Sequence, residues 1–382
     1  MTVTSGPLAG PADARSAANH APDHAPDTSN LRIREFRTLP SPAQVLEELP
    51  LPRALAHRID RSRAEIRAVL DGVDDRLLVI VGPCSIHDSA AGLDYARHLA
   101  AAAEEHRDDL LIVLRAYFEK PRTTVGWKGL INDPHLDGSH DIAEGLRAAR
   151  RFLLGAGDLG LPVATEFLEP ISPQYMADLV SWGAVGARTT ESQIHRQLVS
   201  GLSMPVGFKN GTDGSLDIAL DACRAASSAQ CFLGVDDDGR AAMVGTAGNP
   251  DTHVILRGGS AGPNFSAADV AAATGALAAR GLNPRLVIDA SHANSGKSHV
   301  RQAEVAAELA GRLGDGGPAS AALAGVMLES FLVAGSQKLD EANPGRLTYG
   351  QSITDACMGW DTSEQVLRSL AEAVRRRRED SE

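Results

Sequence analysis

The sequence predicts a (β/α)8 barrel, and the first feature that predicts it is a repeated alternation of strand and helix. Short apolar runs rich in Val, Ile and Leu recur along the chain, separated by Ala-, Leu-, Arg- and Glu-rich stretches of helical character. Continuous apolar strands that alternate with helices are typical of a parallel sheet buried on both faces. Eight such runs, the number that closes a barrel, lie at residues 77–82, 110–115, 162–167, 184–188, 205–209, 253–257, 285–290 and 325–329.

The second feature is the polarity of the strand ends. Each run finishes at or near a polar or ionisable side chain, namely Cys84, Arg115, Glu166, Arg188, Lys209, Arg257, Asp289 with His292, and Glu329. A barrel of this kind builds its active site from the loops at the carboxyl ends of its strands. We therefore expect these side chains to face one pocket.

The chain also contains segments that a minimal barrel does not need. Residues 1–30 are rich in Ala, Pro, Asp, Ser and His and are expected to be a disordered tail. Residues 31–76 are expected to form an N-terminal extension with two helices before a catalytic barrel at 77–375. A stretch at about 229–248 predicts an inserted β-hairpin around an Asp-Asp-Gly turn, and 376–382 predicts a charged tail after a helix end.

Composition favours an enzyme for small anionic substrates. The 382-residue chain has a formal net charge of -12, which argues against general affinity for nucleic acid or for an acidic membrane. It has no apolar run of about 18 residues and no secretory signal pattern. Its four cysteines form no disulfide framework, which fits a reducing compartment. We expect a cytoplasmic homo-oligomer, a dimer or a tetramer, whose partners are small molecules.

Lysine is scarce, and the few lysines indicate where the site lies. Lys and Arg total 37, but only five are lysines: Lys120, Lys128, Lys209, Lys297 and Lys338. Most of them stand in Gly-rich polar loops, where a compact ammonium serves and a guanidinium does not. Together with the strand-end arginines, they exceed what one phosphate requires, and they indicate two anionic substrates, or one substrate with two anionic groups plus a second phosphate.

Four residues of ligand type would meet at the same barrel mouth. A thiolate, an imidazole and carboxylates together favour Mn, Fe, Co or Zn over Mg or Ca. No short-range spacing supports such a site, so an inert buried cysteine and a capping aspartate remain alternatives. The four residues are Cys84, His292, Glu329 and Asp355.

Other residues of ligand type are assigned lesser roles. His87 and Asp88 are rival ligands, but we expect them to begin the helix that follows. Cys357 is expected near the metal, whereas Cys223 and Cys231 are expected to be packing residues.

Several long segments closely resemble the type I 3-deoxy-D-arabino-heptulosonate 7-phosphate (DAHP) synthases, in particular the longer subgroup found in enteric bacteria. The segments are GPCSIHD, RAYFEKPRTTVGWKGLINDP, GARTTESQIHRQLVSGLSMPVGFKNGTDG, HVILRGG, IDASHANSGK, GVMLESFLV and SITDACMGW, and the match runs in order from about residue 31 to 375. The resemblance implies a (β/α)8 barrel with an N-terminal extension and a hairpin before the sixth strand. It also implies a metal-dependent condensation of phosphoenolpyruvate with erythrose 4-phosphate, the entry to the shikimate pathway.

The resemblance further implies a role for each matched residue. Cys84, His292, Glu329 and Asp355 would hold the metal, and Lys120 would act as proton donor beside Cys84 and His292. Phosphoenolpyruvate would be held by Arg115, Lys120, Glu166, Ala187, Arg188, Lys209 and Arg257. Erythrose 4-phosphate would contact Pro121, Arg122 and Thr123.

Two other functions compete with this interpretation. A 3-deoxy-octulosonate 8-phosphate synthase would carry a KANRSS-like loop, where this chain has Lys-Pro-Arg-Thr-Thr at 120–124. A non-catalytic, metabolite-sensing barrel would be expected to lose the ligands or the lysines, which are all present.

Feedback by an aromatic amino acid is a separate question. Leu198, Leu202, Ser203 and Phe232 outline an effector pocket, with ordinary core packing as an equal alternative. Gly234 stands where a serine is common in the inhibitor-binding region, so the sequence does not tell which amino acid binds, if any.

Overall fold

The protein divides into two units, Met1–Thr38 and Leu39–Glu382. The computed structural model describes residues 28–122 and 125–379. Most of the expected N-terminal tail, and Thr123 of the expected aldose site, therefore lie outside the described residues. In the first unit, residues 28–38 contain a turn in which the Ile33 N–H donates to the Asn30 carbonyl.

The second unit contains the predicted barrel. All barrel strands run parallel, and they close in the order β1-β10-β9-β8-β5-β4-β3-β2. The strands are β1 Leu77–Gly82, β2 Leu110–Arg115, β3 Val163–Glu166, β4 Trp182–Val185, β5 Val206–Lys209, β8 Thr252–Leu256, β9 Leu286–Asp289 and β10 Leu323–Glu329. All eight predicted runs are confirmed. The fourth strand ends at Val185, so Arg188 lies in the turn after it rather than at its last residue.

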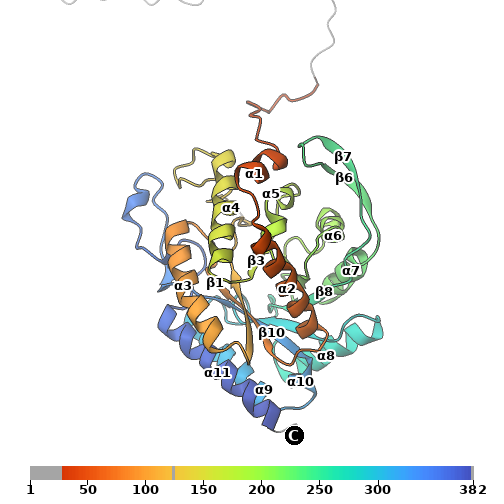
Figure 1. Cartoon of the computed structure of the whole chain (residues 1–382). Coiled ribbons are helices and arrows are strands. Elements are labelled where there is room, and N and C mark those ends of the chain that lie inside the picture. The colour runs from red at the N-terminus through yellow and green to blue at the C-terminus, as the bar shows by residue number, and fades with distance from the viewer. Residues whose placement is uncertain (1–27, 123–124, 380–382) are drawn as a thin grey trace, which may run out of the picture. The chain divides into compact units, whose positions relative to one another are not determined.

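Helices cover the outside of the barrel (Figure 1). They are α3 Ser89–Glu105, α4 Ile142–Asp158, α5 Pro173–Met176 with the 3-10 turn η1 Ala177–Leu179, α6 Gln193–Val199, α7 Asp217–Ala226, α8 Ala267–Ala279, α9 His299–Gly314, α10 Pro318–Ala322 and α11 Trp360–Glu379. After β10, the chain forms the short parallel pair β11 Val333–Ser336 and β12 Gln351–Ser352, with η2 Pro344–Arg346 between them. This excursion carries Asp355 back toward the barrel mouth.

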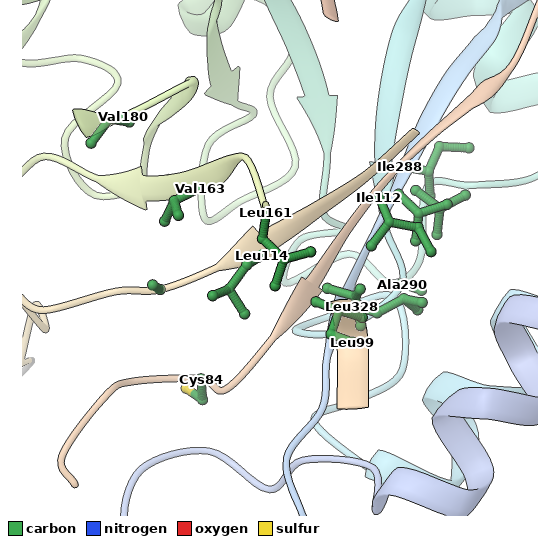
Figure 2. Packing of buried hydrophobic residues seen from close by; sticks show 14 of the residues in the cluster. Cys84, Leu99, Ile112, Leu114, Leu161, Val163, Val180, Ile288, Ala290 and Leu328 are labelled. Carbon is green, nitrogen blue, oxygen red and sulfur yellow. The ribbon is translucent and has the colours of Figure 1, made fainter. Parts of the chain in front are cut away.

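Alternation along each strand divides the core into two layers. On β1, Leu78 and Ile80 belong to the inner cluster, whereas Leu77, Val79 and Val81 pack outward in the larger cluster beneath the helices. Figure 2 shows part of the larger cluster, including Leu114 of β2 and Ile288 of β9. The side chains that point inward at the carboxyl ends of the strands are the ones that reach the candidate site.

The N-terminal extension closes the other end of the barrel. The two expected helices are present as α1 Pro42–Glu48 and α2 Arg53–Leu70. Ile66 and Val69 of α2 share the inner cluster with Leu78 and Leu111, which stand near the beginnings of their strands. Because α2 covers the end where strands begin, access to the barrel interior is left at the end where strands finish.

The inserted hairpin forms where it was predicted, as β6 Cys231–Val235 paired antiparallel with β7 Ala241–Gly245. The prediction that Cys231 is a packing residue is wrong, because its side chain is exposed. A two-stranded ribbon presents alternate residues to each side, and the side that carries Cys231 also exposes the paired Leu233 and Met243.

The C-terminal arginines are more structured than a charged tail. Helix α11 continues to Glu379, beyond the boundary expected at residue 375, and residues 380–382 are outside the described part. Arg375 and Arg378 both donate to the nearly buried Asp109 carboxylate at 2.7 Å. Within the described residues, no helix is both long and apolar enough to cross a membrane.

One buried arginine joins the extension to the barrel. The Arg150 side chain of α4 is fully buried and donates to the Leu49 carbonyl at 2.7 Å and to the Tyr175 carbonyl at 3.0 Å. Its two terminal nitrogens also donate to the two oxygens of Asp178 at 2.7 and 2.8 Å. Arg150 therefore joins the segment after α1, helix α5 and η1 to helix α4.

Replacing Arg150 with Met should lower the free energy of unfolding by about 3 kcal/mol, because it leaves the Asp178 carboxylate and two carbonyls without their donor. Chemical denaturation measures the change. Arg151→Met is the matched control on the same helix, since Arg151 is half-exposed and pairs with Glu144 in a surface contact of at most about 1 kcal/mol. Equal losses in the two variants would contradict this role of Arg150.

Candidate active site

The carboxyl ends of the barrel strands surround a cavity of about 340 Å³. Residues that the sequence assigns to substrate or metal come together in its wall from separate strand ends. They are Lys120, Pro121, Arg122, Glu166, Ala187, Arg188, Lys209, Arg257, His292 and Asp355.

The alternation of the strands explains why these side chains converge. In β1 the inward series runs through Leu78 and Ile80 toward Gly82, and Cys84 stands two residues after the strand, where it packs with the larger cluster and its Sγ lies 3.1 Å from Lys120 Nζ. A side chain at Gly82 would not fit, because a Cβ there would stand 2.3 Å from the carbonyl oxygen of Arg115. Arg115 is the last inward residue of β2. Because Gly82 lets β1 approach the Arg115 backbone closely, it helps to place this cation of the site.

A linked series of polar side chains from four strand ends lies under the cavity. Lys209 Nζ donates to Asp289 Oδ2 at 2.8 Å, and His292 Nδ1 lies 2.8 Å from the same oxygen. His292 Nε2 lies 4.0 Å from Glu329 Oε1, which accepts from Arg115 Nη2 at 3.0 Å. Burial would raise the pKa of Asp289, but Lys209 and His292 outweigh it and hold that pKa well below its ordinary value. The pKa of Glu329 is likewise lowered, since Arg115 and His292 outweigh its burial.

Three predicted metal ligands lie together beside these linked side chains. One ligand atom each of Cys84, Glu329 and Asp355 lies within 4.8 Å of the other two. His292 is not within that distance of all three, although its Nε2 faces Glu329. A soft thiol among hard carboxylates and an imidazole is a donor set that suits a first-row transition metal or zinc, so the residues present fit a divalent ion.

Lys120 lies directly against this cluster. Its Nζ is 3.1 Å from Cys84 Sγ and 3.3 Å from the Cys84 carbonyl oxygen. Burial would lower the pKa of Lys120, but Cys84 and Glu329 raise it above its ordinary value, so the side chain is a cation at neutral pH. Burial and Glu329 raise the pKa of the Cys84 thiol, and a bound metal ion would favour the thiolate.

The lining of the cavity also contains arginines. Arg188 is exposed and donates to the Pro121 carbonyl at 3.0 Å, which links the fourth strand's loop to the second. Arg257 stands directly after β8, the sixth barrel strand along the chain, and partial burial lowers its pKa. Gly186 leaves room for the Glu166 carboxylate, because a Cβ there would lie 2.2 Å from Glu166 Oε1 and displace it. Planar guanidinium groups that face a cavity suit phosphate or carboxylate ligands.

Some predicted residues lie elsewhere. Asp88 is the N-cap of α3 and accepts from the Ala90 and Ala91 N–H groups, and His87 is buried against Phe331 and lines a different cavity, so the structure favours neither as a ligand. Cys357 does lie close to the cluster, with its Sγ 3.4 Å from the Cys84 backbone nitrogen.

The residues of the proposed effector pocket are only partly together. Leu202 and Ser203 line a separate cavity of about 450 Å³ between the extension helices, α5 and the hairpin turn. Leu198 packs against the core instead, and Phe232 stands on the hairpin without lining that cavity.

Sequence reasoning missed two residues of the site. Lys297, to which no chemistry was assigned, lines the main cavity and lies 3.5 Å from Asp355. Glu119 was not singled out, yet its buried carboxylate joins two loops at the base of the site. The scarcity of lysine was a signal for the first, whereas the second stands beside Lys120 without a signal of its own.

Comparison with known proteins points to one family. The model of the DAHP synthetase I family matches residues 56–368. The phospho-2-dehydro-3-deoxyheptonate aldolase of Corynebacterium glutamicum is 55% identical over 92% of this chain and 96% of its own length. The Phe-sensitive enzyme of that name from Escherichia coli is 53% identical, over 91% and 98% respectively. The solved structure of the Francisella tularensis aldolase of the same name superimposes with a TM-score of 0.87 at 46% identity, covering 90% of this chain and 99% of that one.

Proposed function

The chain belongs to the DAHP synthetase I family, and we propose that it condenses phosphoenolpyruvate with D-erythrose 4-phosphate to DAHP and phosphate. This reaction is the first step of the shikimate pathway of aromatic amino acid biosynthesis. The observation that carries the proposal is the meeting of a partly buried ammonium, Lys120, with a thiol and carboxylates at a cavity that arginines also line.

The arginine-lined part of the cavity is the proposed site of phosphoenolpyruvate. Arginine forks match its phosphate and carboxylate, and the backbone N–H of Ala187 offers a further donor beside Glu166. Holding two anionic substrates together against their repulsion turns an encounter in solution into a reaction within one complex. The cations assigned to this task are Arg115, Lys120, Arg188, Lys209 and Arg257.

Erythrose 4-phosphate is assigned to the segment that follows β2. Pro121 and Arg122 line the cavity, and Thr123 is assigned with them from the family resemblance. A short segment here suits a four-carbon aldose, whereas the rival octulosonate synthase uses a five-carbon one.

Lys120 is the proposed proton donor. The C2=C3 π electrons of phosphoenolpyruvate form a C–C bond to the aldehyde carbon, which leaves C2 electron-poor, and the carbonyl electron pair moves to oxygen, which takes a proton from Lys120. Water then adds at C2 and returns one proton to Lys120. The bond from C2 to the phosphate oxygen breaks as the new C2 hydroxyl becomes the ketone, and phosphate leaves with the electron pair and the second proton.

A divalent Mn, Fe, Co or Zn ion is the proposed cofactor, with Cys84, His292, Glu329 and Asp355 as its ligands. When bound, such an ion supplies Lewis-acid polarisation of the aldehyde oxygen. The convergence of Cys84, Glu329 and Asp355 supports the assignment, and Asp289 would orient His292 through its Nδ1.

Assembly and regulation are proposals as well. The exposed apolar pair Leu233 and Met243 supports a homo-oligomer. Relatives include proteins named Phe-sensitive and Trp-sensitive, and the cavity lined by Leu202 and Ser203 is the proposed place of an amino acid effector.

Activity should require both the four-carbon aldose and a metal ion. Phosphate release from phosphoenolpyruvate should occur with erythrose 4-phosphate and not with arabinose 5-phosphate. A chelator should abolish it and added Mn²⁺ should restore it, except in Cys84→Ala, which lacks the thiolate ligand. Turnover that survives complete chelation would contradict the metal assignment, and a preference for arabinose 5-phosphate would contradict the substrate.

Replacing Lys120 with Met should lower kcat at least about 100-fold, because the developing alkoxide loses its proton donor. Steady-state kinetics with measured metal content checks this. Lys128→Met is the matched control, because Lys128 is an exposed lysine of the same segment, and its kcat should stay within about twofold of the parent. Equal activity of the two variants would rule out the role of Lys120.

A further inference from the structure

Glu119 is a buried carboxylate that the proposed reaction leaves without a task. Its side chain is 2% exposed. It accepts hydrogen bonds from the Leu168 N–H at 3.3 Å, the Glu169 N–H at 3.0 Å and the Ser172 hydroxyl at 3.0 Å. In the described part of the chain, no lysine or arginine forms an ion pair with it. Among the described residues, the donors that hold the carboxylate are therefore two N–H groups and a hydroxyl.

Such an arrangement is costly to keep. Burial raises the pKa of Glu119 to about 7, although the two backbone N–H groups and Ser172 oppose the rise. The negative charge of the exposed Glu169 also raises the pKa of Glu119. An apolar residue would avoid the cost of burying a charge, so the carboxylate must contribute something that an apolar side chain does not.

Its position shows what it joins. Glu119 and Lys120 are consecutive, and while Glu119 bonds to residues 168–172, Lys120 reaches Cys84. A backbone hydrogen bond joins the two ends of the 120–128 segment, because the Lys120 N–H donates to the Lys128 carbonyl at 2.8 Å. Gly129 is needed there, because it has a φ of 118° and a Cβ would stand 2.1 Å from the Phe118 carbonyl oxygen. Glu119 thus anchors the backbone from which Lys120 projects.

The segment on the other side is itself fixed. Residues 167–172 directly follow Glu166, which lines the cavity. The Leu168 carbonyl lies 2.9 Å from His195 Nε2 of α6, and the Ser172 hydroxyl, which shares its one proton between two acceptors, lies 3.1 Å from the Glu169 carbonyl oxygen. The carboxylate is therefore bound to a loop that is already held by the next part of the barrel.

From this geometry we infer that Glu119 is a positioning residue, which fixes Lys120 against the loop after β3 so that its ammonium stays at the reacting carbonyl. The inference rests on the proposed function, because it assigns Lys120 as the proton donor. Glu119 touches neither substrate and acts only through Lys120. Misplacement of a reacting group by about 1 Å costs on the order of 100-fold in rate.

The test compares Glu119→Gln with Glu169→Gln. The glutamine at 119 keeps the shape but brings an amide NH2 toward the N–H donors. Its kcat should fall about 10- to 100-fold, while the phosphoenolpyruvate dissociation constant, measured by calorimetry, changes about threefold at most, because four other cations remain. Glu169→Gln changes an exposed side chain beside the same carboxylate and should keep the parent kcat.

A double-mutant cycle separates positioning from general damage. In the Lys120→Met background, Glu119→Gln should lower kcat by less than about twofold, because the group that it positions is gone. An undiminished loss in that background would overturn the inference, as would a Glu119→Gln variant with the parent kcat. If Glu119→Gln does not fold, Ser172→Ala removes one of the three bonds and should lower kcat several-fold, and an unchanged kcat there would overturn the inference.

A second readout does not depend on turnover. The amide proton of Lys120, which donates to the Lys128 carbonyl, should exchange about tenfold faster in Glu119→Gln than in the parent. Unchanged exchange would overturn the inference. A parent chain that does not condense the two substrates would overturn the proposed function, and the exchange result would still decide whether Glu119 holds the Lys120 backbone.

Discussion

The structure depends on a linked series of ion pairs and polar contacts at the carboxyl end of the barrel. Asp289 lies between Lys209 and His292, and Glu329 lies between His292 and Arg115. A single charge buried there would cost several kcal/mol, and removing one member leaves its neighbour unpaired. These groups are therefore stable only together, and the contacts among them fix the position and orientation of each side chain under the cavity.

The barrel makes such a set possible by geometry alone. Parallel strands all finish at one end, and alternation sends every second side chain inward, so Ile80 and Val113 fill the core while Arg115 reaches the mouth. Helix α2 covers the end where the strands begin. Substrates therefore meet the side with the cations. The loops then add what the strands cannot, which is the placement of Lys120 by its neighbour Glu119.

Much of this arrangement could be predicted from the sequence, because it follows from local pattern. Apolar runs of strand length identified all eight barrel strands, and the Asp-Asp-Gly turn identified the hairpin. The clustering of Cys84, Glu329 and Asp355 followed from their position after strands, although their roles came from family resemblance. Glu119 was not predictable, since its partners are about 50 residues away and two of them are backbone N–H groups, which any residue provides. The prediction for Cys231 was wrong because the alternation of residues along a two-stranded ribbon does not show which of its two faces is covered.

The central claim is that strand-end side chains form one metal site at the edge of the substrate cavity. The most direct test is anomalous diffraction at the manganese edge from crystals of the full chain grown with Mn²⁺ and phosphoenolpyruvate. The account predicts a single strong peak within coordination distance of Cys84 Sγ, of His292 Nε2 and of the Glu329 and Asp355 carboxylates. A peak held by other residues, such as His87, or no peak at that cluster would contradict it.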